Sequence, residues 1–142
     1  MNRLIYLDYQ ATTPVDPEVF RAMEPYFTEH FGNAASKTHV FGWKAEAAVE
    51  VAREQVAAIL GAKPEEIIFT SGATESNNLA LIGYANRNSK KGKHVIISEV
   101  EHISIHNIAK YLQKNGFEVS KIPVDYTGRV RLDKLKERIR DD

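Results

Sequence analysis

Apolar positions along the chain fall into blocks whose spacing alternates between that of helices and that of strands. The clearest helical spacing covers residues 40–60 and stops at Gly61, with apolar positions at Ala45, Val49, Ala52, Val56, Ile59 and Leu60. Apolar runs at residues 67–69 and 94–98 predict buried strands, and the partly alternating run at 117–124 predicts a strand nearer a sheet edge. Further helices are expected at residues 17–27, 74–86, 104–115 and 132–139.

From residue 67 onward the expected elements alternate as strand, helix, strand, helix, strand and helix. This order predicts an α/β fold with a mostly parallel sheet flanked by helices and joined by right-handed crossovers. Ligands of such sheets bind beyond the carboxyl ends of the strands. The turn at residues 71–74 and the side chain of His102 each follow a predicted strand, so we expect both to face one crevice.

Composition narrows the class of protein. The 142 residues suit one domain, and an apolar fraction of 43% is enough for a core. Basic and acidic residues number 19 each, so the zero net charge favours neither nucleic acid nor a membrane surface as a partner. Without a membrane-length apolar run or a signal-peptide pattern, a cytoplasmic protein is expected. The sequence has no cysteine, which excludes disulfides and thiolate metal sites, and we expect no metal.

The stretch at residues 67–78 carries the main chemical signal. It is an expected strand, then the small residues Ser71, Gly72 and Ala73, then a helix that Thr74 can cap. Unpaired backbone N–H groups at a helix start bind anions, and small side chains let a ligand approach. The turn lacks the lysine of a mononucleotide P-loop and the three glycines of a dinucleotide fingerprint. The residues alone therefore indicate either a small-anion site or a tight turn without a ligand.

Residues 69–77 closely resemble the phosphate-binding motif of the cysteine desulfurases. These NifS- and IscS-like enzymes belong to the class V aminotransferase family, whose cofactor is pyridoxal 5′-phosphate. Residues 6–17, 31–36, 39–42 and 99–102 resemble further family segments in the same order, so the resemblance covers essentially the whole chain. Ala34, where the family commonly has proline, and Gln10, at a variable position, are small departures.

The resemblance implies the N-terminal part of the aspartate aminotransferase-like fold of pyridoxal-phosphate enzymes. Residues 1–14 would be an arm belonging to the family's small domain, and residues 15–142 the first part of its large cofactor-binding domain. Ala73 and Thr74 would bind the cofactor phosphate, and His102 would be a catalytic residue that stacks on the cofactor ring and moves a proton. On residue grounds alone, a single histidine after a strand is more often structural.

The function implied by the resemblance is transfer of sulfur from L-cysteine, giving alanine and an enzyme persulfide for iron–sulfur cluster assembly. The match corresponds to about the first third of a typical member, before the segments with the cofactor-binding lysine and the nucleophilic cysteine. We therefore expect the chain to be inactive alone and to need a complementary C-terminal segment or chain, in a homodimer that serves an iron–sulfur scaffold protein. Selenocysteine and cysteine sulfinate remain open as substrates. The alternative is a non-catalytic α/β module that binds a phosphate ligand or a partner protein.

Overall fold

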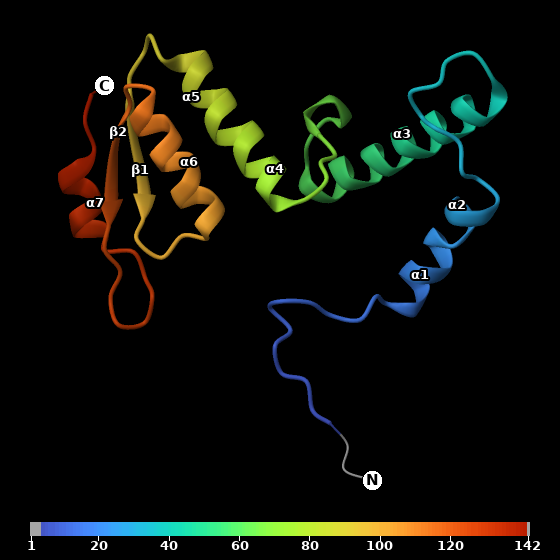
Figure 1. Cartoon of the computed structure of the whole chain (residues 1–142), viewed down its shortest axis with the longest axis horizontal. Helices are drawn as coiled ribbons and strands as arrows, with labels where there is room; N and C mark the ends of the chain where they lie inside the picture. The colour runs from blue at the N-terminus through green and yellow to red at the C-terminus, as the bar shows by residue number, and fades with distance from the viewer. Residues whose placement is uncertain (1–3, 142) are drawn as a thin grey trace. The chain divides into compact units, whose positions relative to one another are not determined.

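The computed structural model describes residues 4–141, which divide into two compact units between Ile68 and Phe69. The first unit contains helices α1 (Pro17–Met23), α2 (Pro25–Thr28) and α3 (Val40–Leu60) and the short 3-10 helix η1 (Pro64–Glu66) (Figure 1). Within the described range, both strands belong to the second unit. No helix among these residues is both long enough and apolar enough to span a bilayer.

Proline positions explain why the helix expected at residues 17–27 forms as two pieces. Asp16 caps α1 by accepting a hydrogen bond from the Glu18 N–H at 2.7 Å, and Pro17 occupies the first helical position. α1 ends at Met23, and α2 begins at Pro25, whose nitrogen has no hydrogen to donate to the preceding turn. The helix expected at residues 17–27 is therefore interrupted at Pro25.

The long helix α3 has the predicted bounds, and two glycines explain its ends. Gly61 follows it in the left-handed conformation, with φ 63°, and donates its N–H back to the last turn. Near the start, a Cβ atom at Gly42 would lie 1.9 Å from the Ser36 carbonyl oxygen, so only glycine allows the preceding loop to fold onto the helix. His39 caps α3, since its Nδ1 accepts the Gly42 N–H at 3.2 Å.

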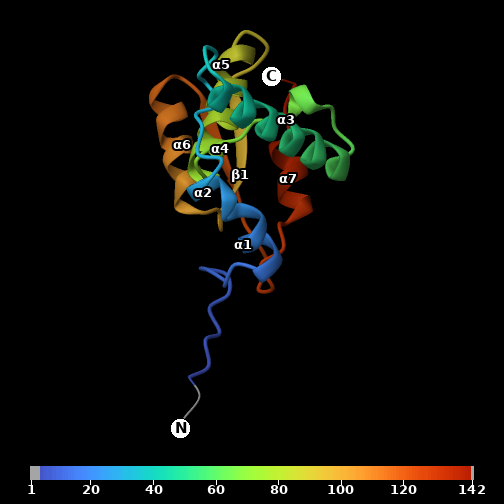
Figure 2. The same cartoon turned by 90° about the vertical axis from the view of Figure 1, so that its right-hand side faces the viewer.

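The second unit is a parallel strand–helix–strand unit covered by further helices. A continuous helical run comprises α4 (Ala73–Asn77), the π-helical segment η2 (Asn78–Ile82) and α5 (Gly83–Asn88). After it come β1 (His94–Ser98), α6 (Ile103–Lys114), β2 (Glu118–Ile122) and α7 (Leu132–Arg138). β1 and β2 pair in parallel, with His94 opposite Glu118 and Ser98 opposite Ile122. In both views the two strands lie between α6 and α7 (Figures 1 and 2).

The core of this unit lies on the α6 face of the strands. Ile108 and Leu112 are one helical turn apart on α6 and pack with Phe117, which precedes β2. The partly buried residues packed against them are Leu81, Ile82, Ala85 and Val95. The helical run and the strands are therefore held together by α6. This packing also fixes the start of α6 relative to α4, and both helices contribute residues to the candidate site described below.

The prediction of a buried strand at residues 67–69 is wrong. These residues form no strand, and Ile68 is 66% exposed. A strand is stable only when neighbouring strands satisfy its backbone groups and cover its side chains. In the described part of the chain the sheet consists of β1 and β2, which pair with each other. The expected strand at 117–124 is also shorter, because it ends at Ile122 before Pro123, which has no N–H for a ladder.

Candidate functional site

The small-residue turn keeps its predicted place before a helix, but its cap differs from the expectation. Gly72, not Thr74, is the N-cap residue, and Thr74 lies within the first turn of α4. Gly72 has φ 157°, a backbone conformation that other residues rarely adopt, and open space surrounds the position where a Cβ would stand. The hydroxyl of Thr70 braces the turn, lying 3.3 Å from the Gly72 carbonyl oxygen and 2.6 Å from the Ser76 hydroxyl.

The start of α4 presents backbone donors to solvent. The first helical hydrogen bond runs from the Ser76 N–H to the Gly72 oxygen at 3.1 Å. The N–H groups of Ala73, Thr74 and Glu75 come before that bond and have no acceptor within the helix. All three residues are exposed. Three adjacent donors beside an open glycine, at the positive end of a helical run, fit a phosphate group.

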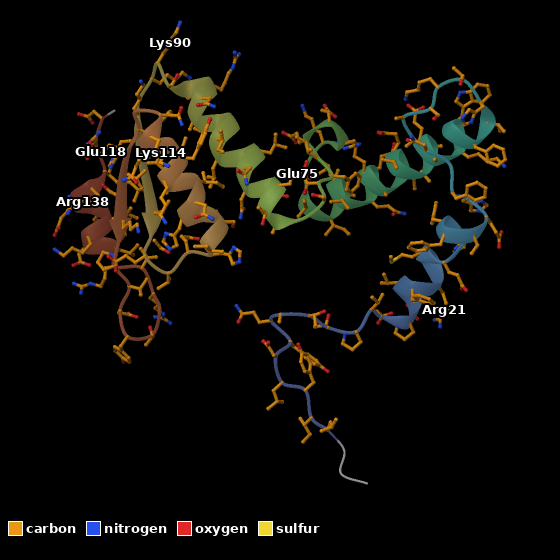
Figure 3. The ribbon with its side chains drawn as sticks, viewed as in Figure 1. Arg21, Glu75, Lys90, Lys114, Glu118 and Arg138 are labelled. Atoms are coloured by element: carbon orange, nitrogen blue, oxygen red, sulfur yellow. The ribbon has the colours of Figure 1, made fainter. Side chains whose placement is uncertain are left out.

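The acidic side chain in this first turn is held back onto the turn itself. One oxygen of Glu75, a residue labelled in Figure 3, accepts hydrogen bonds from the Ser71 N–H at 2.6 Å and from the Ser71 hydroxyl at 2.7 Å. These bonds stabilise the ionised carboxylate, so they lower the pKa of Glu75 below its ordinary value. The bonds fix where the negative charge lies and give the turn a second brace.

His102 lies at the start of α6 and caps that helix. Its Nδ1 accepts the Ser104 N–H at 3.2 Å and lies 2.9 Å from the Ser104 hydroxyl oxygen, while the residue itself is exposed. The same hydroxyl oxygen accepts a hydrogen bond from the Asn77 side-chain amide at 3.0 Å. A chain of polar groups therefore connects the end of α4 with His102.

A cavity of about 510 Å³ lies between the helical run and α6. Thr74 lines it from α4, and Ser104, the hydrogen-bond partner of His102, lines it from α6. The remaining lining residues are Asn78, Ile82, Asn107, Ile108 and Tyr111. Within one unit, the predicted phosphate turn and the neighbour of the predicted stacking histidine thus border one space.

Sequence reasoning missed Asn77 and Ser104. In the sequence, Asn77 is only the last residue of the phosphate-binding motif, and Ser104 is only the first residue of an expected helix. The available signal is a histidine directly before a helix start. The side chain of an N-cap residue accepts a hydrogen bond from the backbone N–H two positions later, which here is that of Ser104. The contact from Asn77 spans 27 residues and has no local signal. Across the described residues, no three His, Asp or Glu side chains gather in a way that could hold a metal ion.

Comparison with known proteins defines the class. The model of the aminotransferase class-V family matches residues 5–142, so the chain belongs to this family. Among curated relatives, cysteine desulfurase IscS 1 of Archaeoglobus fulgidus is 56% identical over 96% of the chain and 36% of its own length. Cysteine desulfurase IscS of Neisseria meningitidis is 53% identical over 97% of the chain and 34% of its own length. The chain thus spans about a third of the length of the curated relatives it matches.

Solved structures agree in fold. A NifS-like protein superposes with a TM-score of 0.90 at 40% identity, covering 97% of this chain and 38% of its own. SspA in complex with cysteine superposes with a TM-score of 0.84 at 38% identity, covering 95% of this chain and 39% of its own. The predicted family and the predicted α/β fold with parallel strands are therefore confirmed.

Proposed function

We propose that this chain provides the phosphate-binding turn and the ring-stacking histidine of a pyridoxal-phosphate site, as part of a cysteine desulfurase. The observation that carries the proposal is the cavity that Thr74 and Ser104 both line. Thr74 belongs to the helix start with its unpaired N–H groups, and Ser104 is hydrogen-bonded to His102. In this assignment residues 15–142 are part of the cofactor-binding domain, and residues 1–14 are an arm of the small domain.

The phosphate would bind at the start of α4. Ala73 and Thr74 would contribute backbone N–H groups, and Thr74 would add its hydroxyl from the cavity wall. Gly72 supports this assignment because the space around its Cβ position is open and would leave room for a ligand. Charge-assisted hydrogen bonds to a phosphate are about twice as strong as bonds between neutral groups. The turn would therefore supply both affinity and a fixed position for the cofactor.

His102 would lie against the face of the cofactor ring. The Ser104 N–H and hydroxyl hold the ring by Nδ1, so the opposite edge, with Nε2, stays free for ligand. An aromatic face over a pyridine ring adds stacking that an aliphatic side chain cannot provide. When bound, pyridoxal phosphate supplies an electron sink next to the substrate carbon.

The substrate would be L-cysteine, with alanine and an enzyme persulfide as products and iron–sulfur cluster assembly as the destination of the sulfur. This substrate is supported by the names of the desulfurase relatives and by the solved complex of SspA with cysteine. The sequence contains no cysteine, so the sulfur-accepting thiol would come from a complementary C-terminal segment or chain. A homodimer and an iron–sulfur scaffold protein complete the proposed partners, in a cytoplasmic setting.

A chimaera tests the proposal directly. The chain replaces the corresponding third of the Archaeoglobus fulgidus relative, and the intact relative serves as the matched control. We expect the chimaera to bind pyridoxal phosphate, seen by its absorption, and to form alanine from L-cysteine. A chimaera that folds, by circular dichroism and a cooperative melt, but neither binds the cofactor nor forms alanine contradicts the proposal.

A further inference from the structure

Ser104 is a buried polar residue, only 7% exposed. Its contacts determine which nitrogen of the His102 imidazole carries the hydrogen. Its backbone N–H can only donate, and the acceptor is Nδ1 of His102 at 3.2 Å. A ring nitrogen that accepts a hydrogen bond uses its lone pair, so Nδ1 carries no hydrogen. In a neutral imidazole the hydrogen is then on Nε2.

The Ser104 hydroxyl strengthens the same form because Asn77 sets its direction. The Asn77 amide nitrogen donates to Oγ at 3.0 Å, so the lone pairs of that oxygen face Asn77. The hydroxyl hydrogen remains free to point at Nδ1 of His102, which lies 2.9 Å away. Amide, hydroxyl and ring form one directed chain of donors that ends on Nδ1.

We propose that Asn77 and Ser104 are positioning residues that hold His102 as the neutral ring with its hydrogen on Nε2. On the proposed function, from which this inference extends, His102 then meets the cofactor as a stacking ring and as a hydrogen-bond donor through Nε2. A proton taken up by Nδ1 would remove the acceptor of both Ser104 donors and uncap α6. The hydrogen-bonded relay of Asn77, Ser104 and His102 therefore presents the N–H of Nε2, and not a bare nitrogen, to the cofactor.

The test reads the ring directly and needs no cofactor. The full 142-residue chain is labelled with 15N-histidine, and His102 is assigned among the five histidines by its loss in His102→Gln. Nitrogen resonances distinguish a ring nitrogen that bears hydrogen from one that does not. At mildly alkaline pH, where an ordinary imidazole is neutral, we expect hydrogen on Nε2 and a bare, hydrogen-bonded Nδ1.

Asn77→Asp should reverse the direction of the hydrogen bonds between residue 77, Ser104 and His102, with almost no change in the shape of the side chain. A carboxylate only accepts, so the Ser104 hydroxyl would turn toward residue 77 and present its lone pairs to His102. We expect the ratio of rings with hydrogen on Nδ1 to those with hydrogen on Nε2 to rise at least about tenfold, equivalent to about 1.4 kcal/mol. Asn107→Asp is the matched control, since it adds the same charge to the same cavity from the next turn of α6. It should leave the ratio unchanged.

A second pair of variants covers the case in which Asn77→Asp does not fold. Ser104→Ala removes the hydroxyl but keeps the backbone N–H, so the Nδ1 resonance should move toward that of a less hydrogen-bonded nitrogen, and Ser104→Thr should restore it. Hydrogen on Nδ1 in the unsubstituted chain, or an Nδ1 resonance indifferent to all of these variants, overturns the relay. If the resonances respond as expected but the chimaera binds no cofactor, the relay stands and the proposed function fails.

Discussion

Thr74→Val isolates one donor of the proposed phosphate site. The substitution exchanges the hydroxyl for a methyl group of nearly the same size, and threonine and valine have similar helix propensities. The Thr74 carbonyl still accepts from the Asn78 amide at 2.7 Å, and the turn keeps its braces from Thr70 and Glu75. The backbone N–H groups at the start of α4 also remain. The variant should therefore fold like the parent and lose a single contact.

The expected loss follows from that arrangement. A hydrogen bond to a charged group contributes about 1.5–3 kcal/mol, which corresponds to about 10- to 150-fold in affinity. Thr74 is exposed, so water can replace part of the lost bond, and the backbone donors still hold the phosphate. We therefore expect the lower end of that range, a weakening of about 10- to 30-fold.

The assay titrates the chimaera with pyridoxal phosphate and, in parallel, with pyridoxal, which lacks the phosphate. Thr74→Val should weaken binding of the first and leave the second unchanged. Thr127→Val, which makes the same exchange in the turn after β2 where the hydroxyl donates to Asp125, serves as the control. Unchanged affinity for pyridoxal phosphate in the Thr74 variant, or equal weakening for both ligands, refutes the assignment.

Four further outcomes are expected. In the chimaera, His102→Phe should keep part of the cofactor binding that His102→Ala loses, because a ring remains to stack. Both variants should lose turnover because both lack the Nε2 hydrogen-bond donor. Wild-type turnover in both would make His102 purely structural. The 142-residue chain alone, given L-cysteine and pyridoxal phosphate, should release no sulfide because it has no cysteine to carry sulfur; sulfide production above that of the cofactor alone would refute this. Leu112→Ala, at a side chain only 1% exposed, should lower the free energy of unfolding by about 2–5 kcal/mol in urea titration. Leu79→Ala, at a half-exposed position, should lower it far less. Equal losses of unfolding free energy would contradict the assigned core. Because hydrogen bonds from Ser71 lower the pKa of Glu75, the stability lost in Glu75→Gln should be largest above pH 4.5 and shrink as pH falls through the lowered pKa; a difference that grows on acidification would reverse the sign.

Local signals accounted for most of the fold. α1 begins at Pro17 and α3 covers residues 40–60, both as expected, because Pro17, Gly61 and the apolar spacing act through contacts within a few residues. The parallel pairing of β1 and β2 followed from a helix of ordinary length between two apolar runs. The strand at residues 67–69 failed because its sequence signals burial, whereas burial requires neighbours that the described residues do not supply.

The candidate site was predictable only in part, for a similar reason. The small residues around Gly72 and the histidine after β1 carry signals within their own segments. The bond between Asn77 and Ser104 depends on how α4 packs against α6, which no local pattern encodes. Thr74 was expected to be the cap because threonine favours that position, but α4 already begins at Ala73, so Gly72 is the N-cap residue.

The π-helical segment η2 constrains the number of residues in its helical run, whatever those residues are. An α-helix turns about 100° per residue, so the extra residue taken up between Asn78 and Ile82 sets the rotation of the part after it relative to the part before. Asn77 meets Ser104 on one side of η2, while Ala85 packs on the core on the other. Losing one residue here would rotate one of these partners away. In evolutionary terms, relatives should show neither insertions nor deletions across this segment, even where they differ at a half-exposed position such as Leu79.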